Sequence, residues 1–288
     1  MNLNRKKKMI AIKPNGNHSN RLLQNLHFEV FCIEHQIEYH NPTFNDIARY
    51  YVEPCNTETT PSLKFLQIDI LGKLFRHSRL VKKLFSVVWI ISKLSCLKLI
   101  RFDKRSEPAD SESLLLKTFE KNDVVYVGGW RFEFPKLIEK HWSEMSRRYS
   151  LKPIMYENNE LVKKVIKLKS EGYSLIGVHI RRGDYKKWKG GIYCYDDNVY
   201  KKHIDNISLQ LAKKGNEKHM FVLFSNDVVN FKQSENLIIS YEDWYIDHHV
   251  MSLCDYLIGP PSTFTLWASY VGKVKLFYLH DCNEDIIL

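Results

Sequence analysis

Short apolar segments alternate with helical patterns through the second half of the chain, and this alternation constrains the fold more than any other feature. The apolar segments are residues 174–180, 220–224, 237–239, 256–258 and 274–278. Between them, apolar side chains recur at the spacing of an amphipathic helix, as in residues 200–211. Strands that alternate with helices predict a parallel, doubly wound α/β sheet. Ligands bind such sheets beyond the carboxyl ends of the strands.

The first half of the chain has a weaker α/β pattern. Residues 9–12 predict a short buried strand, which a polar turn separates from a helix with one apolar face over residues 22–37. Residues 124–127 predict another strand, and residues 134–148 predict further helices. The opening strand, turn and helix are typical of a βα unit.

Residues 80–100 contain the longest apolar stretch of the chain, interrupted by Lys93 and Lys98. A membrane-spanning helix needs about 20 apolar residues with few charges, so this segment is not expected to cross a membrane. It is either a helix of the domain core or an amphipathic helix on the surface of a membrane. A shorter helical pattern precedes it over residues 63–75.

The chain is basic, with 43 lysine and arginine residues against 33 acidic residues and a formal charge of +10. This balance is typical of proteins that bind nucleic acid, an anionic membrane or a phosphorylated substrate, although lysines on solvated faces give the same count. The sequence has no zinc-finger, RNP or basic–aromatic pattern, so we do not expect nucleic acid as a partner.

Neither the cysteines nor the histidines predict a metal site. The six cysteines include no Cys-x-x-Cys pair, and scattered cysteines are typical of a reduced, cytoplasmic protein. His248 and His249 follow Asp247, but consecutive residues on a helix point in different directions. The basic run of residues 5–8 precedes an apolar segment too short for a signal peptide. We therefore expect a cytoplasmic protein without a bound metal.

Two adjacent arginines, Arg181 and Arg182, follow the predicted strand of residues 174–180. Two arginines at the carboxyl end of a buried strand favour an anionic ligand, because a guanidinium group forms paired hydrogen bonds with phosphate. Gly183 permits a sharp turn of the backbone, and Asp184 is placed to hold an arginine in position. The alternative is a surface turn with solvated arginines.

A second polar segment, residues 259–267 (GPPSTFTLW), lies where another predicted strand ends and a helix begins. The amide groups and the dipole at the start of a helix favour phosphate, and the hydroxyl groups of Ser262 and Thr263 add donors. Alone, this segment is also explained by an ordinary helix cap. Together with the two arginines, at matching strand ends of one sheet, it predicts a diphosphate site.

These segments resemble the motifs of a known family. Residues 179–185 (HIRRGDY) closely resemble the His-x-Arg-Arg-Gly-Asp-Tyr motif of bacterial and animal α-1,2-fucosyltransferases, which form glycosyltransferase family 11. Residues 247–267 resemble the last motif of that family, and residues 19–25 resemble its N-terminal Gly-Asn-Gln-Met-Phe-Gln-Tyr loop. The departures are Asn17, His18 and Ser19 in place of Gly-Leu-Gly, Pro261 in place of asparagine and Leu266 in place of tryptophan.

The resemblance implies a GT-B-like α/β fold, with two Rossmann-type domains that face each other across a cleft. We expect an acceptor-side domain at residues 1–152 and a nucleotide-sugar-binding domain at residues 153–288. The implied activity is inverting, metal-independent transfer of fucose from GDP-fucose to a glycan hydroxyl group. An α-1,2 linkage to a galactoside, in bacterial surface polysaccharide synthesis at the inner face of the membrane, would fit, with peripheral association with anionic lipid. No cofactor is expected besides the donor substrate.

The family's phosphate-binding residues carry over to five positions. Arg181 and Arg182 would clamp the diphosphate and neutralise the charge that develops as GDP leaves. Ser262, Thr263 and Phe264 would contact the β-phosphate.

The remaining positions concern the base, the cleft and the proton. His179 and Asp247 would bind guanine, with a helix-capping role for Asp247 as the alternative. Asn20 and Arg21 would face the cleft from the N-terminal side. The candidates for a catalytic base are Asp184, Asp196, Asp197 and Glu29, among which spacing does not decide, and Asp184 better fits an arginine partner.

Two other functions stay open: a degenerate transferase that binds nucleotide or polyanion without turnover, and a transferase of another nucleotide sugar.

Overall fold

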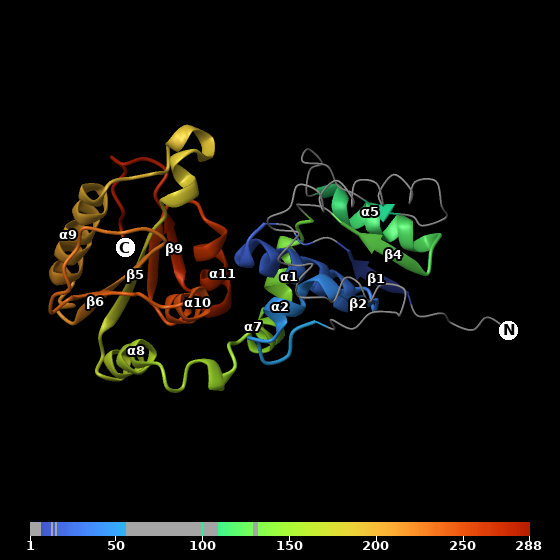
Figure 1. Ribbon diagram of the computed structural model, residues 1–288, viewed down its shortest axis with the longest axis horizontal. Helices are drawn as coiled ribbons and strands as arrows, with labels where there is room; N and C mark the ends of the chain where they lie inside the picture. The colour runs from blue at the N-terminus through green and yellow to red at the C-terminus, as the bar shows by residue number, and fades with distance from the viewer. Residues whose placement is uncertain (1–6, 13, 15, 56–98, 101–108, 129–131) are drawn as a thin grey trace. The chain divides into compact units, whose positions relative to one another are not determined.

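The structure is a computed structural model that describes residues 7–12, 14, 16–55, 99–100, 109–128 and 132–288. The chain divides into two compact units, Met1–Tyr149 and Ser150–Leu288 (Figure 1). This division lies close to the boundary expected after residue 152. The assignment of acceptor to the first unit and donor to the second stays a prediction.

The first unit, residues 1–149, contains a parallel sheet in the order β2-β1-β4-β3. Its strands are β1 (Lys8–Ala11), β2 (Glu38–His40), β3 (Leu99–Ile100) and β4 (Val124–Val127). Its helices are α1 (His18–Glu34), η1 (Pro42–Phe44), α2 (Asn45–Ala48), α5 (Ala109–Glu120), α6 (Pro135–Lys140) and α7 (Trp142–Arg148). The strand, turn and helix predicted at the start of the chain correspond to β1 and α1, although the helix ends before Ile37.

The two helical patterns of residues 63–75 and 80–100 lie outside the described residues, apart from residues 99 and 100. Those two residues form β3, so a helix does not extend to Ile100. Among the described residues, no helix combines the length and the apolar character needed to cross a membrane.

The second unit, residues 150–288, contains a five-stranded parallel sheet in the order β7-β6-β5-β8-β9. Its strands are β5 (Ser174–Ile180), β6 (His219–Ser225), β7 (Leu237–Ile239), β8 (Tyr256–Gly259) and β9 (Lys275–Tyr278). Its helices are η3 (Pro153–Met155), α8 (Glu160–Ser170), η4 (Gly183–Lys186), η5 (Trp188–Gly191), α9 (Asp197–Lys213), α10 (Trp244–Ser252) and α11 (Thr263–Gly272). The doubly wound sheet predicted from the alternation is confirmed.

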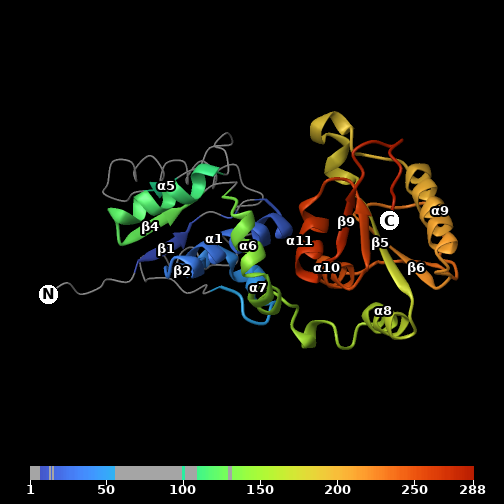
Figure 2. The ribbon, with the colours of Figure 1, turned by 180° about the vertical axis from the view of Figure 1, so that it is seen from behind.

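The central strand β5 is apolar along nearly its whole length because both of its faces are covered. Figures 1 and 2 show α9 on one side of the sheet and α10 and α11 on the other. Ile176, Val178 and Ile180 pack in one core with residues of α9 such as Tyr200 and Ile207. The intervening residues of β5 face the opposite side, where His179 stacks on a ring of α11.

The carboxyl ends of β5, β6 and β8 lie side by side. Ile180 pairs in register with Ser225 of β6, and β8 ends at Gly259 beside β5. Gly259 allows close approach of these strands, because a Cβ atom there would lie 2.7 Å from the carbonyl oxygen of His179. The loops after these strands therefore emerge at one edge of the sheet, where a doubly wound sheet binds ligands.

Candidate functional site

The two polar segments singled out in the sequence meet at this edge. The hydroxyl group of Tyr185, in the loop after β5, donates a hydrogen bond to the carbonyl oxygen of Pro261 over 2.6 Å. Pro261 directly precedes Ser262 and the start of α11. The contact joins the Arg-Arg-Gly-Asp-Tyr segment to the Ser-Thr turn, as the diphosphate prediction requires.

Ser262 is the N-cap residue of α11. Its side-chain oxygen accepts a hydrogen bond from the backbone N–H of Phe264 over 3.2 Å, and its backbone is extended. Ser262, Thr263 and Phe264 are all partly exposed. The cap and the partial positive charge at the helix start are thus present together, and an anion at this end of α11 is electrostatically favoured.

His179 is buried beneath this turn. Its ring stacks on Phe264, with centroids 5.2 Å apart, and Phe264 in turn contacts the ring of His248 at 4.0 Å. Burial, reinforced by the charge of Arg181, lowers the pKa of His179 to about 3, so its imidazole is neutral at pH 7. Within the described residues its Nδ1 atom has no hydrogen-bond partner. A buried ring nitrogen without a partner is costly unless a ligand or water satisfies it.

Arg181 has unused hydrogen-bonding capacity. Its Nη2 atom lies 2.8 Å from a carboxylate oxygen of Asp184, whose side chain is mostly exposed. Its Nε atom is buried and has no hydrogen-bond partner in the part of the chain that the structure describes. The guanidinium also lies over the ring of Tyr185, 5.5 Å from the centroid. Asp184 is thus a partner of Arg181, as expected from the sequence.

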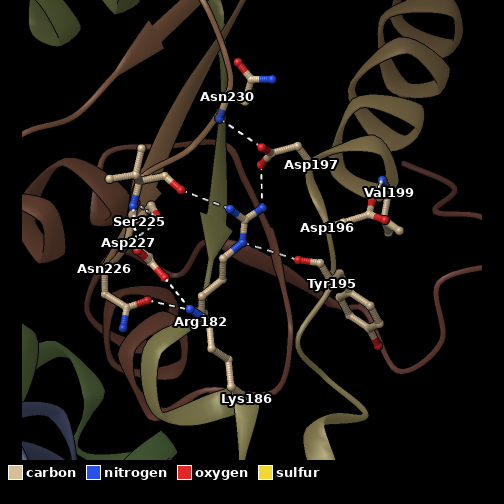
Figure 3. Close-up of polar contacts among 11 residues, drawn as sticks. Arg182, Lys186, Tyr195, Asp196, Asp197, Val199, Ser225, Asn226, Asp227 and Asn230 are labelled. Carbon is tan, nitrogen blue, oxygen red and sulfur yellow. Dashed lines mark hydrogen bonds and ion pairs between the residues drawn. The ribbon is translucent and has the colours of Figure 1, made fainter.

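Arg182 is placed differently, as Figure 3 shows. Its guanidinium donates to Asp197 Oδ1 over 2.5 Å, to the carbonyl oxygen of Val228 over 3.0 Å and to that of Tyr195 over 3.4 Å. The backbone N–H of Arg182 donates to Asn226 Oδ1 over 2.9 Å. Each guanidinium nitrogen therefore has an acceptor within the protein, in contrast to Arg181.

Asp247 lies in the first turn of α10 and is partly buried. Burial raises the pKa of its carboxyl group to about 7, and nearby Glu242 and Asp243 add to the increase, while a hydrogen bond from Ser240 opposes it. Asp243 occupies the N-cap position of α10, so the alternative in which Asp247 caps its helix is wrong. Ser240 was missed in the sequence, although its place directly after the apolar run of β7 marks the same sheet edge.

The first unit, taken by itself, holds Arg21 in its interior. The guanidinium donates to Asp46 over 2.6 Å and 3.0 Å and to the carbonyl oxygen of Thr43 over 2.5 Å, and its side chain is 3% exposed. This burial favours a structural role for Arg21 over contact with a ligand. Asn20 is partly buried beside Gly16 of the polar turn.

The four candidate bases are all engaged with protein groups. Asp184 pairs with Arg181, Asp196 accepts a hydrogen bond from the N–H of Val199 at the start of α9, and Asp197 pairs with Arg182. Glu29 is buried in the first unit. Its carboxylate contacts Arg148 and Tyr149, and burial raises its pKa to about 7. Among the described residues, no group of three His, Cys, Asp or Glu side chains is arranged to hold a metal ion.

Two α/β units, each built on a parallel sheet, define a GT-B-like fold, and solved structures share it. A mutant of FUT1 from Arabidopsis thaliana in complex with GDP is similar with a TM-score of 0.53 at 13% identity, over 95% of this chain and 70% of that chain. The α-1,6-fucosyltransferase NodZ from Bradyrhizobium, soaked with GDP-fucose, has a TM-score of 0.50 at 12% identity, over 92% of this chain and 93% of NodZ. The apo-form of POFUT1 also reaches 0.50 at 12% identity, over 96% and 99% of the two chains.

The family follows from the sequence comparison. Residues 131–285, more than half of the chain, match the model of glycosyl transferase family 11. The chain belongs to this family and is a glycosyltransferase, which confirms the resemblance found in its motifs. No curated protein matches the chain significantly.

Proposed function

We propose that this protein transfers fucose from GDP-fucose to a hydroxyl group of a glycan. The observation that carries the proposal is the meeting of three features at one sheet edge: Arg181 with unused donors, the start of α11, and the buried, unpaired ring nitrogen of His179. Similar structures contain GDP or GDP-fucose, which supports a guanosine nucleotide in this chain.

In this proposal the diphosphate lies between Arg181 and the start of α11, where Ser262, Thr263 and Phe264 contact the β-phosphate. When the bond between fucose C1 and the β-phosphate oxygen breaks, negative charge develops on that phosphate. Arg181 and the α11 amides stabilise this charge. Asp184 orients the guanidinium of Arg181.

The base of the nucleotide would lie toward Asp247 and His179. A carboxylate accepts hydrogen bonds from both the ring N–H and the exocyclic amine of guanine. The neutral ring of His179 supplies a further polar contact. Asn20, from the first unit, is proposed to contact the donor as well.

The reaction we propose inverts the configuration at fucose C1: the acceptor oxygen forms a new bond to C1, GDP leaves, and the acceptor proton passes to a base. It needs no metal, because the positively charged arginine and the helix start neutralise the leaving phosphate. We further propose an α-1,2 linkage to a galactoside of a bacterial surface polysaccharide, made at the cytoplasmic face of the membrane. The formal charge of +10 supports peripheral association with anionic lipid there.

The donor is tested with thermal unfolding in GDP, UDP, CDP and ADP, followed by GDP release from GDP-fucose in the presence of galactosides. We expect GDP alone to raise the unfolding temperature markedly, and GDP release to depend on the acceptor. Stabilisation by UDP or CDP instead would reject the GDP-sugar assignment.

A degenerate, binding-only protein is the second candidate, favoured by residues 17–19, which replace the glycines of the family's first motif. It predicts GDP binding without acceptor-dependent release.

A further inference from the structure

The loop after β5, the start of α9 and the loop after β6 are joined by the Arg182–Asp197 ion pair and the hydrogen bonds around it (Figure 3). Arg182 comes from the loop after β5, and its acceptor Val228 comes from the loop after β6. The carboxylate partner of Arg182, Asp197, is the first residue of α9. Asp197 uses its second oxygen to accept the backbone N–H of Asn230 over 2.9 Å. The Arg182–Asp197 pair thus contacts three segments that are separate in sequence.

Other contacts hold the same two loops together. Lys186 Nζ lies 3.0 Å from Asp227 Oδ2, and the backbone N–H of Arg182 is bound by the side chain of Asn226. Gly183 adopts a left-handed conformation with φ 43°, and a Cβ atom there would lie 2.6 Å from Asn226 Nδ2. A side chain at position 183 would therefore strain the backbone and force the Asn226 amide, which binds the N–H of Arg182, to shift.

The two adjacent arginines differ in what remains for a ligand. The side chains of Arg182 and Asp197 are 15% and 25% exposed, so the pair is largely shielded from water and its charges neutralise each other. Arg181 has a buried Nε without a partner among the described residues, and its carboxylate partner is 59% exposed. Only Arg181 therefore combines an unsatisfied donor with a weakly held charge.

We propose that Arg182 and Asp197 are a positioning pair that fixes the loop carrying Arg181, and that Arg181 is the arginine that contacts the diphosphate. The proposal rests on the proposed function of this site. It reassigns Arg182 from the diphosphate clamp expected from the sequence, and it gives Asp197 a role other than that of a base. Both oxygens of its carboxylate already accept hydrogen bonds, one from Arg182 and one from the backbone N–H of Asn230.

The test measures the binding of GDP and of GMP, which lacks the β-phosphate, by calorimetry without metal. The variants are Asp197→Asn, Arg182→Ala and their combination. The matched control is Asp205→Asn, an exposed aspartate on the same helix α9. We expect each single variant to weaken GDP binding about tenfold or more, with GMP binding and the control unchanged. The double variant should bind GDP no more weakly than the weaker single variant, because both changes remove one pair.

The direction in which Asp197→Asn changes GDP affinity distinguishes a positioning role of Arg182 from direct contact of Arg182 with the diphosphate. If Arg182 contacts the diphosphate directly, release of its guanidinium from Asp197 leaves GDP affinity unchanged or higher, and that result overturns the proposal. An equal loss of GDP and GMP affinity, or a loss of the folded state in Asp197→Asn, also overturns it, because the pair then only stabilises the unit. If the unmodified protein binds GDP no better than GMP, the proposed function itself fails, whatever the variants do.

Discussion

Ser240 donates a hydrogen bond from its hydroxyl group to Oδ1 of Asp247 over 2.5 Å, and this contact ties the end of β7 to the first turn of α10. The carboxyl group is thereby held at the same sheet edge as His179. Its pKa is raised to about 7, chiefly by burial. A carboxyl group kept partly buried in the first turn of a helix, against the preference of its charged form for water, is typical of a functional site.

The raised pKa predicts how Asp247 affects stability. The folded state holds the Asp247 proton up to about pH 7, whereas the unfolded chain loses it near 3.8. The unfolded state therefore binds fewer protons between these values, and the contribution of Asp247 to the free energy of unfolding falls as pH rises through this window. Above about pH 7 the penalty is complete and constant.

Asp247→Asn has no such titration. We compare the free energy of unfolding of Asp247→Asn with that of the unmodified protein, both without nucleotide. The difference, variant minus unmodified protein, should rise by about 1.4 kcal/mol for each pH unit between about pH 5 and about pH 7. Denaturant unfolding at pH 5, 6, 7 and 8 measures the difference, with Asp205→Asn as the control. A difference that is the same at all four values would show that the Asp247 pKa is ordinary.

Arg181→Ala should reduce turnover at least about a hundredfold, because it removes a charged donor from the phosphate on which charge develops. Arg181→Lys should be poor too, since lysine does not form the paired contact of a guanidinium. Acceptor-dependent GDP release measures both, and Lys201→Ala, which removes an exposed cation from α9, is the control. A near-normal rate in Arg181→Ala would end the diphosphate assignment of this residue.

Much of this site was predictable because its elements have regular sequence patterns. The strands of the second unit were found from their apolar runs, and Ser262 was recognised as a helix cap from its place between a strand and a helix. A strand ends where its apolar run gives way to polar residues. The sequence therefore located the strand ends where His179, Arg181 and Ser262 lie.

The pairing of charged side chains was not predictable in the same way. Arg182 pairs with Asp197 at a sequence separation of fifteen, and Arg21 pairs with Asp46 at a separation of twenty-five. Such contacts depend on loop conformations that have no repeating pattern. Two adjacent arginines looked equivalent in the sequence, and only the partners of Arg182 distinguish them.

Chelation of metal should leave the reaction largely intact. The positive charge for the leaving diphosphate comes, in our proposal, from Arg181 and the start of α11, and the sequence has no Asp-x-Asp motif. We expect GDP to stabilise the protein, and GDP release from GDP-fucose to continue, with EDTA present. Activity that EDTA abolishes and manganese restores would contradict metal independence.

Gly259→Ala should displace His179, because it forces apart the neighbouring strands β5 and β8. The new methyl group would lie 2.7 Å from the His179 carbonyl oxygen and 3.1 Å from its Cβ atom, so β5 and β8 must separate there. We expect a loss of about 1–3 kcal/mol in the free energy of unfolding and weaker GDP binding, because His179 moves. Gly172→Ala also strains the backbone, because Gly172 has a φ of 84°, but nothing lies within 4 Å of the added atom, so it should lower stability while it leaves GDP binding unchanged. Unaltered GDP affinity in Gly259→Ala would place the nucleotide away from His179.

The last prediction concerns the choice of base. Guanine presents a ring N–H and an exocyclic amine side by side, and a carboxylate accepts from both, whereas an asparagine amide has one acceptor oxygen. Asp247 is a carboxyl group at this edge that accepts a hydrogen bond from the hydroxyl group of Ser240 and forms no ion pair with an arginine or a lysine among the described residues. Asp247→Asn should therefore weaken GDP binding and narrow the preference for GDP over IDP, which lacks the exocyclic amine.

The proposed contact between Asp247 and guanine also predicts how GDP affinity depends on pH. Because Asp247 must lose its proton to accept both hydrogens, GDP affinity should decline as pH falls below about 7 in the unmodified protein, and this part of the decline should vanish in Asp247→Asn. Calorimetric titration with GDP and IDP at pH 6 and pH 8 measures both effects. Asp243→Asn, at the exposed N-cap position of the same helix, is the matched control for base selectivity. An unchanged ratio of GDP affinity to IDP affinity in Asp247→Asn would reject the guanine contact. It would show that residue 247 does not accept hydrogen bonds from both the ring N–H and the exocyclic amine of guanine.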